Sequence, residues 1–524
     1  MMMLMRRLEV GAVRRVVLLM MLIAACPARS SSVPTSRIAT TAKPLPALKK
    51  IRIGIQPQKH SVALVALGCP KNTVDAEVML GDLQRSGLRV VKQPEHADIV
   101  IVNTCAFVED AKAESIAAVV EAAALKEDGR VPARGLFVTG CLAQRYAEEL
   151  ATELPEVDAV VGFEHYAELP DQVMRVLTET APVEGESDAE TAEEAVEAAG
   201  SASSPAVLVG SASVPFRNEE DRVRLTPPHI AYLRVAEGCD HACSFCAIPG
   251  FRGSFRSKPY DVVLAEAERL VASGVREINL IAEDTNQYGS DWGATDGRRL
   301  AHLLRDLAAM PQLKWIRLLY CYPSYFSDDL VDAIASIDKV VKYIDIPLQH
   351  LAPTVLRRMR RPAAEGTVAL LRKLRARIPS LVLRSTFICG FPGESAEEHA
   401  TLVRLARSIG FERGGAFSYS SEDGTPAAEM EGQVADETRE ARRDELLAHF
   451  QHRAEAWAAA QVGTQLRVII DRMDGMDAIG RTYADAPEID GSVRLPECAL
   501  APGTELLATV VAADVMELVA VPVL

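Results

Sequence analysis

Short apolar runs alternate with longer amphipathic segments along most of the chain from Val62 onward. In the first stretch the runs are VALVALG, ADIVIVNTC, GLFVTGC and DAVVG, and the segments between them, such as TVDAEVMLGDLQRSG, have helix-like spacing. Alternation of buried strands with helices is typical of a parallel sheet covered on both faces. The pattern therefore predicts an α/β fold that begins with a doubly wound parallel sheet over residues 61–177.

A second alternation predicts a larger α/β unit over residues 228–461. Its six apolar runs are IAYLRVAEG, EINLIAED, KWIRLLY, KYIDIPLQ, LVLRSTFICG and GGAFSYS, each separated by a helix-length segment, and a long helix is expected over 436–461. Six strand-helix units favour a partial (β/α)6 barrel, with function at the carboxyl ends of its strands. Residues 462–524 contain short β-rich runs between Gly, Pro and Asp, which predicts a small all-β barrel.

Two segments lack this alternation. Residues 178–227 are acidic and rich in Ala and Ser, with no Lys or Arg before Arg217, and we expect a disordered insert there. Residues 1–60 carry an apolar run, Val16–Ala25, behind four arginines, followed by a stretch that is rich in Ser and Thr. A signal-like run followed by a transit-like stretch predicts import into a plastid, with the mitochondrion as the alternative. The run is too short to span a bilayer, so we expect no membrane segment in the mature protein.

Charge and cysteine content narrow the function. The chain has 57 Lys and Arg against 72 Asp and Glu, a formal charge of −15. That balance counts against a broad nucleic-acid surface, because such surfaces are basic. Ten cysteines in 524 residues are too sparse for a disulfide framework. Six of them form two regular sets, so metal or redox chemistry is the better expectation.

The first set lies in one loop, EGCDHACSFCAIPGFRG, after the first strand of the predicted barrel. Cys239, Cys243 and Cys246 supply three thiols there, with no fourth cysteine nearby. A structural zinc site normally has four protein ligands, and His229 or His241 would have to complete it. Three thiolates on a four-iron cluster instead leave one iron open to a small molecule. The sequence leaves both alternatives open and favours the cluster.

The second set is spread over the first domain. Cys69, Cys105 and Cys141 are spaced 36 residues apart, each at or just after the end of a predicted strand. The carboxyl ends of parallel strands share one edge of the sheet, so these side chains can converge. Three ordinary buried cysteines are the alternative. We predict that the three thiols hold a second four-iron cluster.

The loop CDHACSFC resembles the cluster motif of radical S-adenosylmethionine (SAM) enzymes. The resemblance implies that the central domain is a radical SAM partial barrel, and that its cluster binds SAM and generates a 5′-deoxyadenosyl radical. The segment GFPGE follows a strand, and Gly390, Gly393 and Glu394 are expected beside SAM, because glycines let the backbone approach a ligand closely. No polar residue is singled out as catalytic.

Both sets together, in this order, resemble the methylthiotransferases of the radical SAM superfamily. Further matching motifs are GCPKNTVDAE, NTCAFVEDAKAES, LIAEDTNQYG and YIDIPLQH, and the C-terminal barrel is expected to be TRAM-like. The resemblance implies that the upstream cluster delivers sulfur and that SAM also donates the methyl group. It covers roughly Val62 to Leu524 apart from the insert. It identifies neither the sulfur donor nor the electron donor.

Two subclasses differ in substrate. One modifies an aspartate of small-subunit ribosomal protein uS12 (RimO type), and the other modifies an adenosine of tRNA (MiaB type). GCPKN and DAPEIDG are similar to the first. From Gln461 to Leu524 there are ten acidic residues, four arginines and no lysine. Such a barrel would repel phosphates and attract a basic protein. We therefore expect uS12 as the partner, with tRNA as the alternative and a non-catalytic zinc scaffold as a weaker one.

Overall fold

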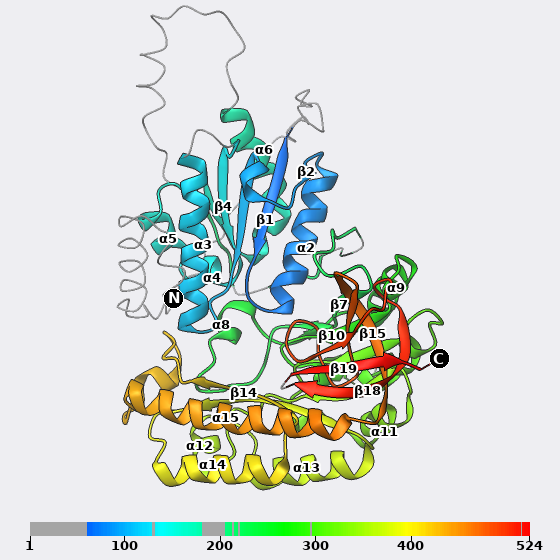
Figure 1. Ribbon diagram of the computed structural model, residues 1–524. Helices are drawn as coiled ribbons and strands as arrows, with labels where there is room; N and C mark the ends of the chain where they lie inside the picture. Colours follow the sequence, from blue (N-terminus) through cyan, green and yellow to red (C-terminus); the bar gives the residue numbers. More distant parts are fainter. Residues whose placement is uncertain are drawn as a thin grey trace, which may run out of the picture. The chain divides into compact units, whose positions relative to one another are not determined.

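The structure is a computed structural model, and it describes residues 60–127, 132–180, 205–211, 214–217, 219, 221–293, 296–514 and 516–523. The chain folds into two compact units, which Figure 1 shows in the colours of the sequence. The first comprises the described residues up to Leu67, with Met79–Ala106 and Asp110–Val209. The second comprises Gly68–Val78, Phe107–Glu109 and the described residues from Gly210 on. The segment predicted to be a targeting peptide lies outside the described residues.

A six-stranded parallel sheet forms the first unit, which confirms the predicted doubly wound fold. Its strand order is β2-β1-β3-β4-β5-β6. The strands are β1 (Ser61–Ala66), β2 (Arg89–Val90), β3 (Ile99–Thr104), β4 (Gly135–Thr139), β5 (Ala159–Val161) and β6 (Ala206–Leu208). Helices α2 (Pro70–Arg85), α3 (Glu109–Glu127), α4 (Gly140–Arg145), α5 (Ala147–Glu153) and α6 (Leu169–Glu179) connect them. β3 and β4 are buried along their whole length, as parallel strands covered on both faces require.

Strand β6 corrects one expectation. It lies within residues 178–227, which the composition predicted to be disordered, yet it pairs in parallel with β5. Glu219, also in that segment, is 4% exposed and bonds to Arg234. The short apolar run Ala206-Val207-Leu208 adds an edge strand to the sheet. The prediction of disorder rested on the composition of the whole segment 178–227, and that composition does not reveal one short apolar run.

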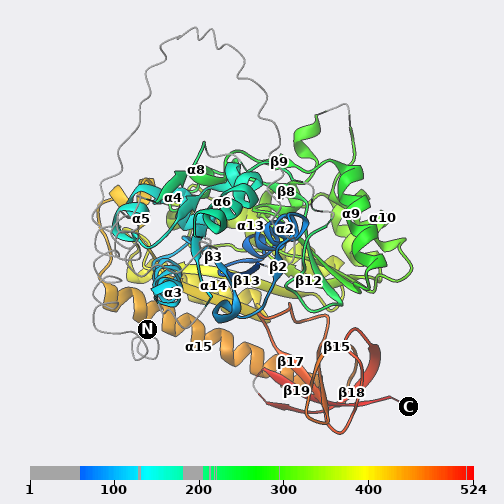
Figure 2. The same cartoon turned by 90° about the horizontal axis from the view of Figure 1, so that it is seen from above.

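A second six-stranded parallel sheet, open between β7 and β14, confirms the predicted partial barrel. Its order is β14-β13-β12-β11-β10-β7. The strands are β7 (Ile230–Arg234), β10 (Glu277–Ile281), β11 (Trp315–Leu318), β12 (Val340–Asp345), β13 (Val382–Cys389) and β14 (Arg413–Ser418). The intervening helices include α9 (Tyr260–Ala272), α10 (Leu300–Ala308), α11 (Asp328–Ser336), α12 (Pro353–Arg358), α13 (Ala364–Arg377) and α14 (Ala396–Ile409). Figure 2 shows α9 and α10 on the outer side of these strands, where apolar residues from both layers form one core.

A closed five-stranded barrel follows the long helix α15 (Asp436–Gln461), and both features agree with the sequence. The strands are β15 (Gln465–Asp474), β16 (Asp477–Arg481), β17 (Ser492–Leu495), β18 (Glu505–Asp514) and β19 (Glu517–Pro522). The DAPEIDG segment between β16 and β17 connects this barrel to the second six-stranded sheet through hydrogen bonds. Asp485 bonds to Arg413 at 2.7 Å, and Asp490 accepts a hydrogen bond of 2.7 Å from the Tyr343 hydroxyl. Its two aspartates are therefore held inside the fold.

None of the helices in the described part of the chain is long and apolar enough to cross a membrane.

Candidate functional site

The three-cysteine loop begins at the carboxyl end of β7, after the short strand β8 (Ala236–Glu237). Gly238 starts it with φ of +76°, and a Cβ there would lie 2.2 Å from the carbonyl oxygen of Ser254. The amide of Cys239 donates to the carbonyl of Gly253 at 3.0 Å. The close approach of the two backbones requires glycine at 238 and fixes where the loop leaves the strand.

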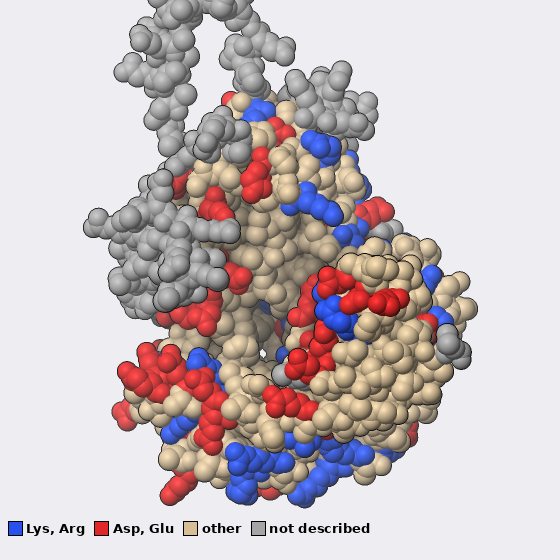
Figure 3. Space-filling view, viewed as in Figure 1, with Lys and Arg blue, Asp and Glu red and all other residues tan. Residues whose placement is uncertain are grey.

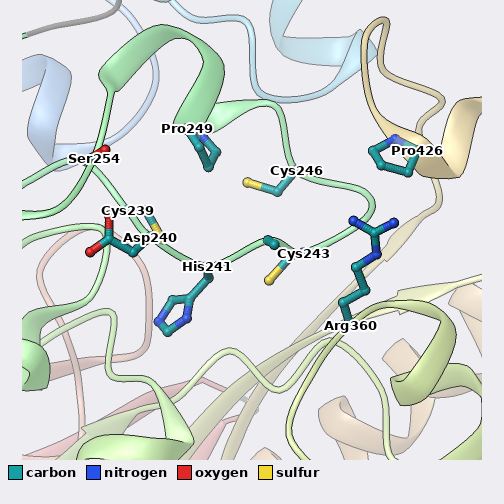
Figure 4. Close-up of a pocket in the computed structure, with 10 residues that line it drawn as sticks. Cys239, Asp240, His241, Cys243, Cys246, Pro249, Ser254, Arg360 and Pro426 are labelled. Atoms are coloured by element: carbon teal, nitrogen blue, oxygen red, sulfur yellow. The ribbon is translucent and has the colours of Figure 1, made fainter.

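All three thiols line one pocket of about 370 Å³. In Figure 4 the sulfur atoms of Cys239, Cys243 and Cys246 face the space that the loop encloses. The other lining residues are Asp240, His241, Ala242, Pro249, Ser254, Arg360 and Pro426. The structure therefore brings together the three residues that the motif singled out, in a cavity with room for a larger group than one ion.

Burial controls the protonation of these thiols. It raises the pKa of Cys239 and that of Cys246 to about 12. Their thiolates therefore need a compensating positive charge to form near neutral pH. Bound iron or zinc supplies such a charge, so metal binding and deprotonation are coupled here.

Neither histidine considered as a fourth zinc ligand faces the pocket with a free ring. His241 Nε2 lies 2.8 Å from Oδ2 of Asp284, and its ring is stacked on Tyr322. His229 Nε2 lies 2.9 Å from Oδ1 of Asp471 in the C-terminal barrel. Across the described residues, no three His, Cys, Asp or Glu side chains are arranged to hold a single metal ion. A four-iron cluster binds each thiolate through a different iron, so its ligands lie farther apart.

The turn GFPGE (Gly390–Glu394), which the sequence predicts to lie beside SAM, is held together by the side chain of Glu394. Glu394 Oε2 accepts hydrogen bonds from the amides of Gly390 and Phe391, and Gly390 and Gly393 have φ of +75° and +73°. Glu394 is 4% exposed. Burial by itself raises the pKa of Glu394. The ring nitrogens of His350 and His399, 3.8 and 3.2 Å from its Oε1, together with the Arg442 guanidinium, outweigh that effect and lower the pKa to about 2. Through its Oε2 the carboxylate therefore holds the turn.

The upstream cysteines lie after strands that are neighbours in the first sheet. Thr104 and Gly140 form a parallel bridge, so Cys105 and Cys141, the next residue of each segment, lie at the same edge. Gly140 has φ of +93°, and a Cβ there would lie 2.3 Å from the Thr104 carbonyl oxygen. Both cysteines are buried, at 6% and 7% exposure. Cys69 follows β1 by three residues and belongs to the second compact unit.

Arg360 is a charged pocket residue that the sequence did not single out. Arg360 follows α12 with φ of 55°, a left-handed conformation that is uncommon for arginine, and its side chain reaches the pocket beside Cys243. Its position depends on how α12 ends, and the arginine-rich run RRMRR carries no pattern that indicates a pocket.

Three family models match the chain. They are Uncharacterized protein family UPF0004 over residues 61–162, Radical SAM superfamily over 233–406, and TRAM domain over 462–523. The fold and these matches define a radical SAM enzyme, and the superfamily implies a four-iron cluster and SAM.

Curated relatives narrow the class. The chain is 43% identical over 461 residues to the ribosomal protein uS12 methylthiotransferase RimO of Anaeromyxobacter sp. (strain Fw109-5), covering 87% of this chain and 91% of that one. It is 41% identical over 447 residues to the RimO of Desulfitobacterium hafniense (strain Y51), covering 84% and 93%. The chain therefore belongs to the RimO family of radical SAM methylthiotransferases.

Among solved structures, the radical SAM methyltransferase TsrM from Kitasatospora setae, with tryptophan and a SAM analog bound, aligns with a TM-score of 0.48. The sequences are 14% identical, and the alignment covers 79% of each chain.

Proposed function

We propose that this enzyme replaces a hydrogen on the β-carbon of an aspartate in ribosomal protein uS12 by a methylthio group. The observation that carries the proposal is the convergence of Cys239, Cys243 and Cys246 on one pocket in a chain of the RimO family. These three would hold a four-iron cluster and leave one iron for SAM. When bound, the cluster and SAM supply the radical chemistry, and the protein's own residues orient the reactants and exclude water.

A second cluster is proposed on Cys69, Cys105 and Cys141. Cys105 and Cys141 share one edge of the sheet through the Thr104–Gly140 bridge, and Cys69 follows the adjacent strand. This cluster would supply the inserted sulfur, in keeping with the sequence resemblance.

The backbone of Gly390 and Gly393 is proposed to approach SAM, with Glu394 holding the turn beneath it. The contacts of Glu394 within the turn support this assignment of roles. Substitution of either glycine would strain the backbone, because both have positive φ.

The surface of the C-terminal barrel supports a basic protein as substrate. Among its described residues, Asp474, Glu488, Glu497 and Asp514 are exposed. The exposed cations are Arg467 and Arg472, and Arg467 is paired with Asp338. Figure 3 shows acidic side chains, with a few basic ones among them, along one edge of the barrel region. This charge would repel tRNA phosphates and steer a basic ribosomal protein. Lys and Arg of α13, which could attract RNA, include Lys373 and Arg377, and both are paired with aspartates.

The test uses the anaerobically reconstituted enzyme with SAM, a one-electron reductant and a sulfide source. Purified uS12 and tRNA are supplied in separate reactions, and mass spectrometry measures the product. We expect a methylthio group on one uS12 aspartate and none on tRNA. Modified adenosine with unmodified uS12 would favour the MiaB-type alternative, and a protein that binds zinc but no iron would exclude both enzyme functions.

We also propose that residues 1–60 direct the protein to an organelle, most readily a plastid. The proposal rests on the apolar run at Val16–Ala25 and on the acid-free stretch that follows it. A fluorescent fusion of these sixty residues should localise to the plastid. Mitochondrial fluorescence would select the alternative, and a cytosolic signal would contradict import.

A further inference from the structure

Three flat side chains are stacked beside the cysteine loop. The rings of His241 and Tyr322 are nearly parallel, with centroids 3.6 Å apart and an interplanar angle of 11°. The guanidinium of Arg361 also lies on Tyr322, 4.3 Å from its centroid. We call this group the His241–Tyr322–Arg361 stack.

Neighbouring residues hold the first two members. Asp284 is completely buried and bonds to the His241 ring at 2.8 Å. The backbone of Tyr322 exchanges two hydrogen bonds with the side chain of Asn286, at 2.6 and 2.8 Å. The Tyr322 backbone and the His241 ring stacked on Tyr322 are therefore held without Arg361, and a partner already in place reduces the entropy lost when the guanidinium is held there.

The charged member of the stack reaches the cysteine loop. Arg361 Nη1 donates to Sγ of Cys243 at 3.7 Å, and Nη2 donates to the Pro347 carbonyl at 2.5 Å. The loop is tied to the same region, because the amide of Ser244 donates to the Met359 carbonyl at 3.1 Å. A guanidinium stays protonated at all physiological pH values. The structure thus places a permanent positive charge on one of the three pocket thiols.

We propose that Arg361, held by this stack, raises the reduction potential of the cluster that Cys239, Cys243 and Cys246 would hold. The inference rests on that proposed ligand set. Reduction transfers one electron from an external one-electron reductant to the cluster, and Arg361 gains and loses neither a proton nor an electron. The added negative charge is stabilised by the guanidinium and by its N–H···S hydrogen bond, and both favour the reduced state. Arg361 is a positioning residue, since it acts through Cys243.

The test measures the potential of one cluster in the full chain. Cys69, Cys105 and Cys141 are replaced by alanine, the protein is reconstituted anaerobically with iron and sulfide, and reduction is followed by electron paramagnetic resonance at controlled potentials. Arg361→Gln should lower the equilibrium constant for reduction at least tenfold, which is about 59 mV for a one-electron couple. Arg357→Gln, which removes an exposed arginine from α12, should leave the potential unchanged.

A second pair of variants tests the stack without removing charge. Tyr322→Leu removes the ring on which Arg361 lies and should lower the potential by less than Arg361→Gln does. Tyr322→Phe keeps the ring and should match the parent. If Arg361→Gln does not load iron, the comparison of Tyr322→Leu with Tyr322→Phe decides the question.

Three failures can be told apart. A four-iron Arg361→Gln variant with the parent's potential would overturn the role of Arg361. Equal potentials for Tyr322→Leu and Tyr322→Phe would overturn the role of the stack. If alanine at Cys239, Cys243 and Cys246 leaves the iron content unchanged, the proposed ligand set itself has failed.

Discussion

The two sets of three cysteines are assembled in different ways. Cys239, Cys243 and Cys246 lie within one loop, and local backbone contacts place all three on one pocket. Cys105 and Cys141 are brought together by strand pairing across 36 residues, and Cys69 belongs to a separate segment. A site built from one loop is specified by a short motif. A site built from strand ends depends on the whole sheet, so substitutions far from its ligands should disturb it.

The largest expected effect comes from removing the loop ligands. Replacing Cys239, Cys243 and Cys246 with alanine should lower the iron content from about eight to about four per chain and abolish reductive SAM cleavage. The upstream iron should remain, because its ligands lie on another sheet. Iron analysis and product detection measure both effects, and loss of all iron would show that the two sets are not independent.

The glycine that precedes Cys141 tests whether the upstream set depends on strand pairing. Gly140→Ala would place a Cβ 2.3 Å from the Thr104 carbonyl at a positive φ, and should cost about 1–3 kcal/mol in strain besides the clash. Because the Thr104–Gly140 bridge aligns Cys105 with Cys141, the iron content should fall from about eight toward about four.

Gly250→Ala is the matched control for this prediction. Gly250 lies in the short helix α8 (Ile248–Arg252) after Cys246, and a Cβ there would meet nothing within 4 Å. It should keep the parent's iron content and thermal midpoint. If Gly140→Ala behaves in the same way, the upstream thiols do not depend on the strand bridge.

Glu394 tests whether the turn at Gly390–Glu394 also depends on contacts with residues far away in the sequence, His350 and His399. Its lowered pKa, from 4.5 to about 2, corresponds to about 3 kcal/mol of stability at neutral pH. A depressed pKa means that this stability is complete above the usual value and is lost as the pH falls from about 4.5 toward about 2. In Glu394→Gln we expect a lower free energy of unfolding at neutral pH and a weaker acid dependence.

Urea midpoints at about pH 5.5 and about pH 3.5 measure the effect, because they bracket the usual pKa. Glu397→Gln, which changes an exposed carboxylate on α14, is the control and should leave the midpoints near those of the parent. An identical acid dependence in Glu394→Gln would mean that the histidine contacts do not hold this carboxylate ionised.

The sequence predicted what local patterns encode. The six strands of the second sheet were evident because each is an apolar run between helical segments, and the cysteine loop was evident because its ligands are close together. The His241–Tyr322–Arg361 stack could not be predicted, because its members come from three separate segments that meet only in the folded barrel.

The DAPEIDG segment shows a second limit. Its resemblance indicated a substrate subclass, but the pattern gave no sign that Asp485 and Asp490 are buried against Arg413 and Tyr343. Acidic residues are usually exposed, and only a tertiary partner makes burial favourable. The exposed charge that supports a basic substrate comes instead from other acidic residues of the barrel.

The smallest expected effect comes from removing one serine hydroxyl beside each cysteine set. Ser115 is completely buried, and its Oγ both accepts from the Cys105 amide and donates to the Cys105 carbonyl, each at 2.9 Å. Ser244 is equally buried, but its Oγ makes one bond, of 2.8 Å, to the Arg358 carbonyl, while its backbone holds the loop in addition. Ser115→Ala should therefore cost more, about 1–3 kcal/mol against about 1 kcal/mol for Ser244→Ala.

The rate of iron loss to a chelator measures this difference at the sites themselves. Ser115→Ala should release the upstream iron faster than the parent, because the backbone of Cys105 loses a donor and an acceptor together. Ser244→Ala should release downstream iron at close to the parent's rate, since two backbone hydrogen bonds still hold Ser244. Thr152→Ala, which removes an exposed hydroxyl in the first unit, should change neither rate. If both serine variants release iron at the same rate relative to the parent, then ligands at strand ends depend on a single hydroxyl no more than ligands within one loop do.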